Sequence, residues 1–128
     1  MENKGPRNIG LSSLMGYRFP VTAISSILHR ISGVLLFVLV PFVVWALNVS
    51  LKDQASFEAV KETISTGFLS FILWVFLSAL IYHLFAGVRH LLMDIGLGEG
   101  KCTGRLGSWI VIILSIIFMV LLGVCLWA

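Results

Sequence analysis

The final segment of the chain, LGSWIVIILSIIFMVLLGVCLWA at residues 106–128, contains no lysine, arginine, aspartate or glutamate. Two earlier segments, residues 31–51 and 63–88, share this property, and each of the three segments is at least 21 residues long. A helix needs about 20 apolar residues to cross the hydrocarbon core of a bilayer. The three segments therefore predict an all-α integral membrane bundle with three transmembrane helices.

The expected architecture is a single transmembrane anchor domain over residues 1–128, with a short cytoplasmic segment at its N-terminus. Pro20 suits the start of the first helix, and three glycines after Asp94 break the chain between the second and third helices. The predicted spans are residues 21–48, 64–94 and 106–127.

The composition excludes several other classes of protein. Hydrophobic residues make up 59% of the chain and charged residues 12%, whereas an ordinary soluble domain carries about 25% charged residues. So few charges cannot cover the apolar surface of a short soluble chain, which excludes a soluble enzyme, a nucleic-acid binder and a disulfide scaffold. Cys102 and Cys125 are predicted on opposite sides of the membrane, so no internal disulfide is expected.

The basic residues predict the orientation in the membrane. Seven lie before or in the first turns of span 1 or between spans 2 and 3, and only Lys52 and Lys61 lie on the opposite side. Cytoplasmic loops carry the excess of lysine and arginine. The N-terminus is therefore expected in the cytoplasm, and the C-terminus on the periplasmic side.

Ser26, His29 and Arg30 form a polar cluster near the start of the first predicted helix. Ser26 and Arg30 are four residues apart and share a helix face. A hydroxyl beside a guanidinium at that depth can bind the carbonyl of a lipid-soluble ligand with a polar head. Alternatively, Arg30 extends to phosphate headgroups and Ser26 bonds to its own backbone. The residues alone leave both interpretations open.

A second cluster closes the second predicted helix. His83 and His90 are seven residues apart and nearly eclipsed on one face, with Gly87 between them. His83 lies about 16 Å deeper than Asp94 at 1.5 Å per residue, near the middle of a roughly 30 Å core. A neutral imidazole there can bind haem iron, and the glycine lets a flat macrocycle approach the backbone. The alternative for His83 is an interhelical hydrogen bond. The alternative for His90 is interfacial pairing with Asp94 or headgroups, and that for Asp94 and Arg89 is an interfacial ion pair or a helix-end charge.

The two clusters are expected at similar depth in the same half of the bilayer. The first helix enters from the cytoplasm and the second returns to it, which brings Arg30 level with His83. The propionates of a haem on His83 would then point towards His29 and Arg30. Because His83 is the only deep histidine, a second axial ligand would come from another chain, so a hetero-oligomer is expected.

Two stretches of the sequence carry a family resemblance. Residues 18–33, RFPVTAISSILHRISG, look like the N-terminal signature of the cytochrome b membrane-anchor subunit of bacterial succinate dehydrogenase. Residues 82–96, YHLFAGVRHLLMDIG, resemble the haem-ligand signature of the same family. The order of the motifs, their spacing and the three-span layout also match that family.

The resemblance implies a subunit of succinate:ubiquinone oxidoreductase, the respiratory complex II of the bacterial inner membrane. The implied partners are a flavoprotein that oxidises succinate, an iron–sulfur protein, and a second small membrane anchor. This chain would be the larger anchor, without a catalytic residue for succinate oxidation itself. It would take part in the transfer of electrons to ubiquinone.

Residue roles also follow from the resemblance. Ser26 and Arg30 match residues that line the ubiquinone pocket, where a cation and a hydroxyl stabilise the negative charge that develops on the quinone oxygen. His83 matches an axial ligand of haem b iron, the second ligand coming from the other anchor. His29 and Arg30 match residues near the haem propionates, and Asp94 matches a position near the quinone site.

Two other functions are weighed against this one. The chain could anchor a quinol:fumarate reductase, which runs the reaction in the opposite direction. It could instead be a cofactor-free membrane scaffold, which would tolerate the loss of His83 and show no haem absorbance.

Overall fold

The computed structural model describes residues 19–128, and all regular structure in this range is helical. Three of the helices, α2, α4 and α5, are long and apolar enough to cross a membrane. The predicted all-α bundle with three membrane-spanning helices is therefore confirmed. The helix bounds are α2 at Val21–Ser50, α3 at Gln54–Ser65, α4 at Gly67–Asp94 and α5 at Lys101–Trp127.

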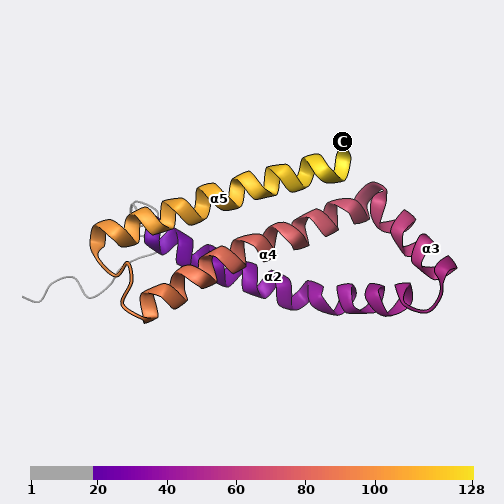
Figure 1. Ribbon diagram of the computed structural model, residues 1–128, viewed down its shortest axis with the longest axis horizontal. Helices are drawn as coiled ribbons and strands as arrows, with labels where there is room; N and C mark the ends of the chain where they lie inside the picture. Colours follow the sequence, from indigo (N-terminus) through magenta and orange to yellow (C-terminus); the bar gives the residue numbers. More distant parts are fainter. Residues whose placement is uncertain (1–18) are drawn as a thin grey trace, which may run out of the picture.

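The three long helices lie along the long axis of the molecule, and α3 lies at one end, where it joins α2 to α4 (Figure 1). At the opposite end, the start of α2, the end of α4 and the start of α5 come together (Figure 1). Helix α4 packs against both α2 and α5. The chain thus passes up, down and up along the bundle, as three consecutive spans with short connections require.

Helix α2 begins directly after Pro20, whose carbonyl accepts hydrogen bonds from the backbone N–H groups of Ala23 and Ile24. Proline fits this position because its missing N–H is not needed before the first turn. The helix continues through Pro41. Membrane helices tolerate an internal proline because neighbouring groups satisfy the freed carbonyl.

The expected second span at residues 64–94 is divided in the structure. Helix α3 ends at Ser65, Thr66 is extended, and α4 begins at Gly67 with a backbone φ of +60°. The side-chain hydroxyls of Ser65 and Thr66 donate to carbonyls in the last turn of α3 and so satisfy that helix end. The Ser-Thr-Gly sequence is the signal for this break, but the stretch from residue 63 to 88 carries no charge, and the predicted span therefore extends across it.

Helix α3 is a separate polar helix that the sequence analysis had treated as part of a loop. The carboxylate of Asp53 accepts a hydrogen bond from the backbone N–H of Ser56 at 2.7 Å, which caps the first turn. This hydrogen bond also lowers the pKa of Asp53 below its ordinary value. Further along the helix, Lys61 and Glu58 form an exposed ion pair at 3.8 Å.

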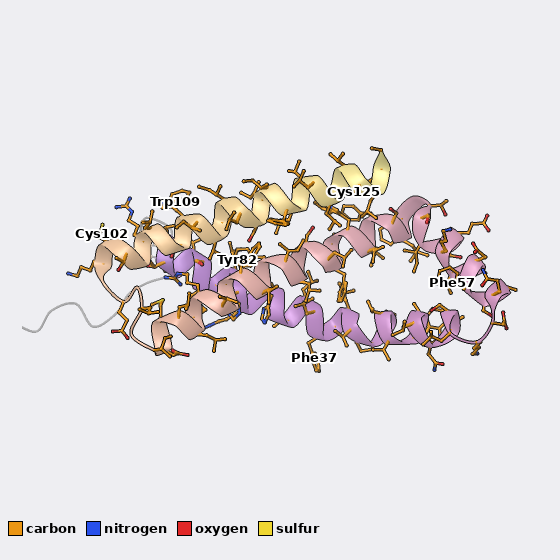
Figure 2. All side chains as sticks on the ribbon, viewed as in Figure 1. Phe37, Phe57, Tyr82, Cys102, Trp109 and Cys125 are labelled. Carbon is orange, nitrogen blue, oxygen red and sulfur yellow. The ribbon has the colours of Figure 1, made fainter. Side chains whose placement is uncertain are left out.

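Helix α5 begins at Lys101, five residues before the predicted start of the third span. The carbonyl of Gly100 accepts hydrogen bonds from the Gly104 N–H at 2.7 Å and the Thr103 hydroxyl at 3.1 Å. Arg105 therefore lies within the helix rather than in the connecting loop. Cys102 and Cys125 are free and lie at opposite ends of α5, which agrees with the expected absence of an internal disulfide (Figure 2).

Several of the described basic residues lie near the ends of the bundle, as expected if the distribution of lysine and arginine sets the orientation in the membrane. Lys101 and Arg105 lie at the end that holds the start of α2, and Lys52 and Lys61 lie at the α3 end (Figure 1). Lys4, Arg7 and Arg18, which contribute to the predicted cytoplasmic excess, lie outside the described residues. The orientation therefore stays a prediction.

The interior of the bundle is built from small side chains. Tyr82, Ala86 and Val111 form a buried cluster between α4 and α5, and most of the buried polar residues are serines. Small residues allow helix backbones to approach closely, which is how helices associate when lipid removes the usual hydrophobic driving force. Tyr82 lies inside the bundle, whereas Phe37 points outward from α2 and is 81% exposed (Figure 2).

Gly123 brings α5 close to a large side chain of α4. A Cβ atom at this position would lie 3.2 Å from Nε1 of Trp74. That nitrogen is held in place because it donates a hydrogen bond to the carbonyl of Met119 at 3.0 Å. A side chain at position 123 would therefore press on the indole ring and strain this hydrogen bond, which favours glycine there.

We expect Gly123→Leu to lower the free energy of unfolding by about 1–3 kcal/mol, because the added side chain forces α4 and α5 apart. Thermal unfolding of the purified complex in detergent measures this effect. Val120→Leu, at a 59% exposed position one turn earlier in α5, is the matched control and should unfold like the wild type. Equal unfolding temperatures for the two variants would contradict the close contact at Gly123.

Candidate functional site

Three histidine side chains from two helices meet in the bundle. The rings of His29 on α2 and His83 on α4 are stacked, with centroids 4.2 Å apart and an interplanar angle of 15°. His90, also on α4, is tilted by 47° against His29 at a centroid distance of 5.1 Å. The structure therefore brings the two polar clusters of the sequence to the same level of the bundle.

The His83 ring is held by a short stretch of α2. Its Nδ1 atom lies 3.2 Å from the carbonyl oxygen of His29 and 3.1 Å from the hydroxyl oxygen of Ser32. Ser32 is buried, and its hydroxyl also donates to the His29 carbonyl at 2.8 Å. A Cβ atom on Gly33 would lie 3.1 Å from Cε1 of His83, so a side chain there would displace the ring.

Ser32 and Gly33 are not among the site residues that the sequence predicts. Their signal was nevertheless present, because Ser32 follows His29 by three residues and lies about one helical turn further along α2. The interhelical hydrogen bond that was weighed as an alternative role for His83 is present through Nδ1. It engages one ring nitrogen only, and Nε2 makes no hydrogen bond with residues 19–128.

His29 has a buried ring nitrogen, Nε2, without a hydrogen-bond partner in the described part of the chain. A Cβ atom on Gly87 would lie 3.5 Å from this nitrogen, so the glycine makes room for the imidazole. The sequence analysis assigned that room to a macrocycle, whereas the structure places the His29 ring there. A buried polar atom without a partner is costly. The described residues therefore leave the hydrogen-bonding capacity of Nε2 unused.

Ser26 and Arg30 lie one turn apart on α2, next to the histidine cluster in the chain. Ser26 is half-buried and Arg30 is exposed, and neither makes a side-chain hydrogen bond or ion pair with residues 19–128. Both side chains are free to meet a ligand. The neighbouring Ser25 is the fully buried serine, and Tyr82 on α4 donates its hydroxyl to the Ser25 carbonyl at 3.0 Å.

Of the two alternatives for Arg89 and Asp94, the ion pair is wrong, and the helix-end charge is confirmed for Asp94. Arg89 is buried and donates through Nη2 to the carbonyl of Gly104 on α5 at 3.1 Å, whereas Asp94 is exposed at the end of α4. Within residues 19–128 the single ion pair is that between Lys61 and Glu58.

A hollow of about 880 Å³ adjoins Arg89 between the ends of α2, α4 and α5, but none of the predicted site residues lines it.

The histidine cluster suits a haem better than a bare metal ion. No group of three or more His, Cys, Asp or Glu side chains in the described range is arranged to hold a metal ion. A haem supplies four nitrogen ligands itself and requires only one or two axial ligands from protein. His29 and His83 are stacked face to face, so their nitrogen lone pairs do not converge on one atom. Only one of these two rings could therefore hold the iron of a haem from this side.

Comparison with known proteins supplies the family. The sequence model of the family described as "Succinate dehydrogenase/Fumarate reductase transmembrane subunit" matches residues 6–122. The chain belongs to this family. The resemblance read from residues 18–33 and 82–96 is confirmed, and the chain is a membrane-anchor subunit of the succinate dehydrogenase complex.

Three relatives are named "Succinate dehydrogenase cytochrome b556 subunit". The one from Coxiella burnetii (strain RSA 493 / Nine Mile phase I) is 38% identical over 99% of this chain and 100% of its own length. The one from Rickettsia typhi (strain ATCC VR-144 / Wilmington) is 35% identical over 84% of each chain. The one from Paracoccus denitrificans is 34% identical over 75% of this chain and 73% of its own.

The hydrogen bond from Tyr82 to Ser25 holds α4 against α2 one residue before His83. We expect Tyr82→Phe to lower the free energy of unfolding by about 1 kcal/mol, because it removes a buried interhelical hydrogen bond. Thermal unfolding of the purified complex measures the loss. Ser70→Ala removes a buried hydroxyl that has no partner in residues 19–128, so it should cost much less. A larger loss in Ser70→Ala than in Tyr82→Phe would contradict this assignment.

Proposed function

We propose that this anchor subunit binds haem b through His83 and forms part of a ubiquinone site with Ser26 and Arg30. The observation that carries the proposal is the cluster of His29, His83 and His90 inside membrane-spanning helices. Ionisable side chains are expensive within a membrane and mark functional sites there. The complex would be a succinate:ubiquinone oxidoreductase.

The residues of this chain fit a haem in two ways. The Nε2 atom of His83 makes no hydrogen bond with the described residues, so its lone pair is available to iron. The buried Nε2 of His29 has no partner either, and it can donate a hydrogen bond to a haem propionate, with the Arg30 guanidinium supplying a compensating positive charge. When bound, haem supplies a centre that accepts and returns one electron at a time.

Ser26 and Arg30 would act on the quinone. Oxidation of succinate to fumarate releases two electrons and two protons, and ubiquinone takes up two of each to become ubiquinol. The electrons place negative charge on the quinone oxygens before the protons arrive. A fixed guanidinium and a hydroxyl in a low-dielectric site stabilise that charge.

The proposed assembly follows from what this chain lacks. The family resemblance implies that a second axial ligand for the haem would come from the second small anchor subunit, and the stacking of His29 on His83, which keeps His29 from opposing it, is compatible with this. The flavoprotein and iron–sulfur subunits would dock at the cytoplasmic end, close to Ser26 and Arg30. We infer a location in the bacterial inner membrane, with the N-terminus cytoplasmic and the C-terminus periplasmic.

His83→Ala removes the proposed iron ligand. We expect the haem absorbance of the purified complex to fall to a small fraction of the wild-type value, measured by a reduced-minus-oxidised spectrum. Ser108→Ala, which alters a buried serine on α5 whose hydroxyl donates to the Gly104 carbonyl, should keep the full spectrum. An unchanged spectrum in His83→Ala would refute haem binding at this position. A wild-type complex without haem absorbance would favour the cofactor-free scaffold.

Ser26→Ala and Arg30→Ala test the quinone site. We expect the succinate–ubiquinone reductase rate to fall roughly tenfold or more in Arg30→Ala, since a hydrogen bond to a charged group contributes about 1.5–3 kcal/mol. The loss in Ser26→Ala should be smaller. Succinate oxidation with a soluble acceptor dye should continue in both variants. Arg105→Ala, an exposed arginine on α5, is the control, and wild-type rates and quinone affinity in both test variants would overturn the pocket.

The direction of the reaction is a further part of the proposal. The family description includes fumarate reductases, but the three relatives compared are named for succinate dehydrogenase. We therefore infer net succinate oxidation. A purified complex that reduces fumarate with quinol much faster than it oxidises succinate would favour the opposite direction.

A further inference from the structure

Ser32 and the carbonyl of His29 together surround one nitrogen of the His83 ring. The Ser32 hydroxyl oxygen lies 3.1 Å from Nδ1, and the His29 carbonyl oxygen lies 3.2 Å from it. These two oxygens are themselves joined, because the Ser32 hydroxyl donates to the same carbonyl at 2.8 Å. The three groups form a closed triangle within the bundle, and Ser32 is only 6% exposed.

The hydrogen-bonding capacity of these three groups decides whether the proton of the neutral His83 ring lies on Nδ1 or on Nε2. The His29 carbonyl can only accept, and Ser32 uses its one hydroxyl proton on that carbonyl. A bare Nδ1 could accept the Ser32 proton instead, but that would take the proton from the His29 carbonyl and leave this carbonyl oxygen facing the Nδ1 lone pair at 3.2 Å, which is repulsive. With its proton on Nδ1, the ring donates to both. The contacts of Ser32 and His29 thus select the Nδ1–H tautomer.

We infer that Ser32 is a positioning residue that sets the tautomer and orientation of His83 and thereby tunes the group bound to its Nε2 atom. This inference rests on the proposed function, in which that group is haem iron. A neutral imidazole with its proton on Nδ1 carries its free lone pair on Nε2. Gly33, whose Cβ would lie 3.1 Å from Cε1 of His83, leaves the space that this ring orientation requires.

We expect these hydrogen bonds to make the midpoint potential of the haem lower than it would be without them. An N–H group that donates to acceptors makes the opposite ring nitrogen a stronger electron donor. Stronger donation stabilises ferric over ferrous iron, so the hydrogen bonds to Nδ1 hold the potential down. Removal of the Ser32 oxygen leaves the His29 carbonyl as the sole acceptor and weakens the effect.

Redox titration of the purified complex tests the inference, with the haem spectrum as readout. Ser32→Ala should shift the haem midpoint potential in the positive direction. Ser32→Cys, whose sulfur is a weak acceptor of similar size, should shift it the same way. Ser32→Thr restores a hydroxyl and should return the potential close to the wild-type value, as should the control Ser108→Ala, whose hydroxyl donates only to the Gly104 carbonyl.

Wild-type potentials in both Ser32→Ala and Ser32→Cys would overturn the role of Ser32. If Ser32→Ala does not assemble, the comparison of Ser32→Cys with Ser32→Thr decides in the same way. Failure of all three variants to assemble, beside an intact Ser108→Ala complex, would assign Ser32 to packing alone and overturn the inference.

Failure of the proposed haem binding can be distinguished from failure of the role of Ser32. A haem spectrum that is lost in His83→Ala, together with an unshifted potential in Ser32→Ala, rejects the role of Ser32 and leaves the proposed function intact. A complex that keeps its haem in His83→Ala, or that contains none, rejects both.

Discussion

The contact between His83 and the backbone of α2 is the interaction on which the site depends. Inside lipid, a polar side chain must find its hydrogen-bond partners within the protein. His83 meets this constraint through the His29 carbonyl and the Ser32 hydroxyl. The same contact fixes the register of α2 against α4, so that the ring of His29 stacks on that of His83. One requirement for satisfied polar groups thus both aligns the helices and forms the cluster.

The other helix contacts extend the same constraint along the bundle. Near the histidines, Tyr82 donates a hydrogen bond to Ser25. Towards the end of α4, Arg89 donates to the Gly104 carbonyl. Nearer the start of α4, Trp74 donates to the Met119 carbonyl. Each bond runs from a side chain of α4 to backbone on a neighbouring helix. Small side chains, mostly serine, alanine and glycine, lie between them and let the backbones approach. Helix α4 is therefore the central element that carries the site and holds the other two spans.

Much of the fold could be predicted because lipid imposes simple rules on composition. A stretch without charge that is long enough to cross a bilayer becomes a helix, and α2 and α5 follow from that rule. The break at Thr66 was missed because the charge-free stretch begins at residue 63, before the break, so the absence of charge alone does not reveal it. The early start of α5 was missed because Lys101 and Arg105 were interpreted as loop charges, whereas charged residues are also compatible with the first turns of a helix at the membrane surface.

For the site, the sequence identified His29 and His83 by their chemistry and depth, and their proximity agrees with the topology argument. It did not identify Ser32, Gly33 or the burial of Arg89. These depend on how α2 and α5 are rotated about their axes against α4.

By itself, the sequence determined that three helices cross a membrane, because charge-free length is a local property of the chain. It also determined which family the chain belongs to, because residues 18–33 and 82–96 carry the signatures without reference to their surroundings. Only the tertiary structure decided which nitrogen of His83 is engaged and which is left without a partner. That outcome depends on a contact between residues 51 positions apart, and no local pattern contains the rotation and register that bring them together.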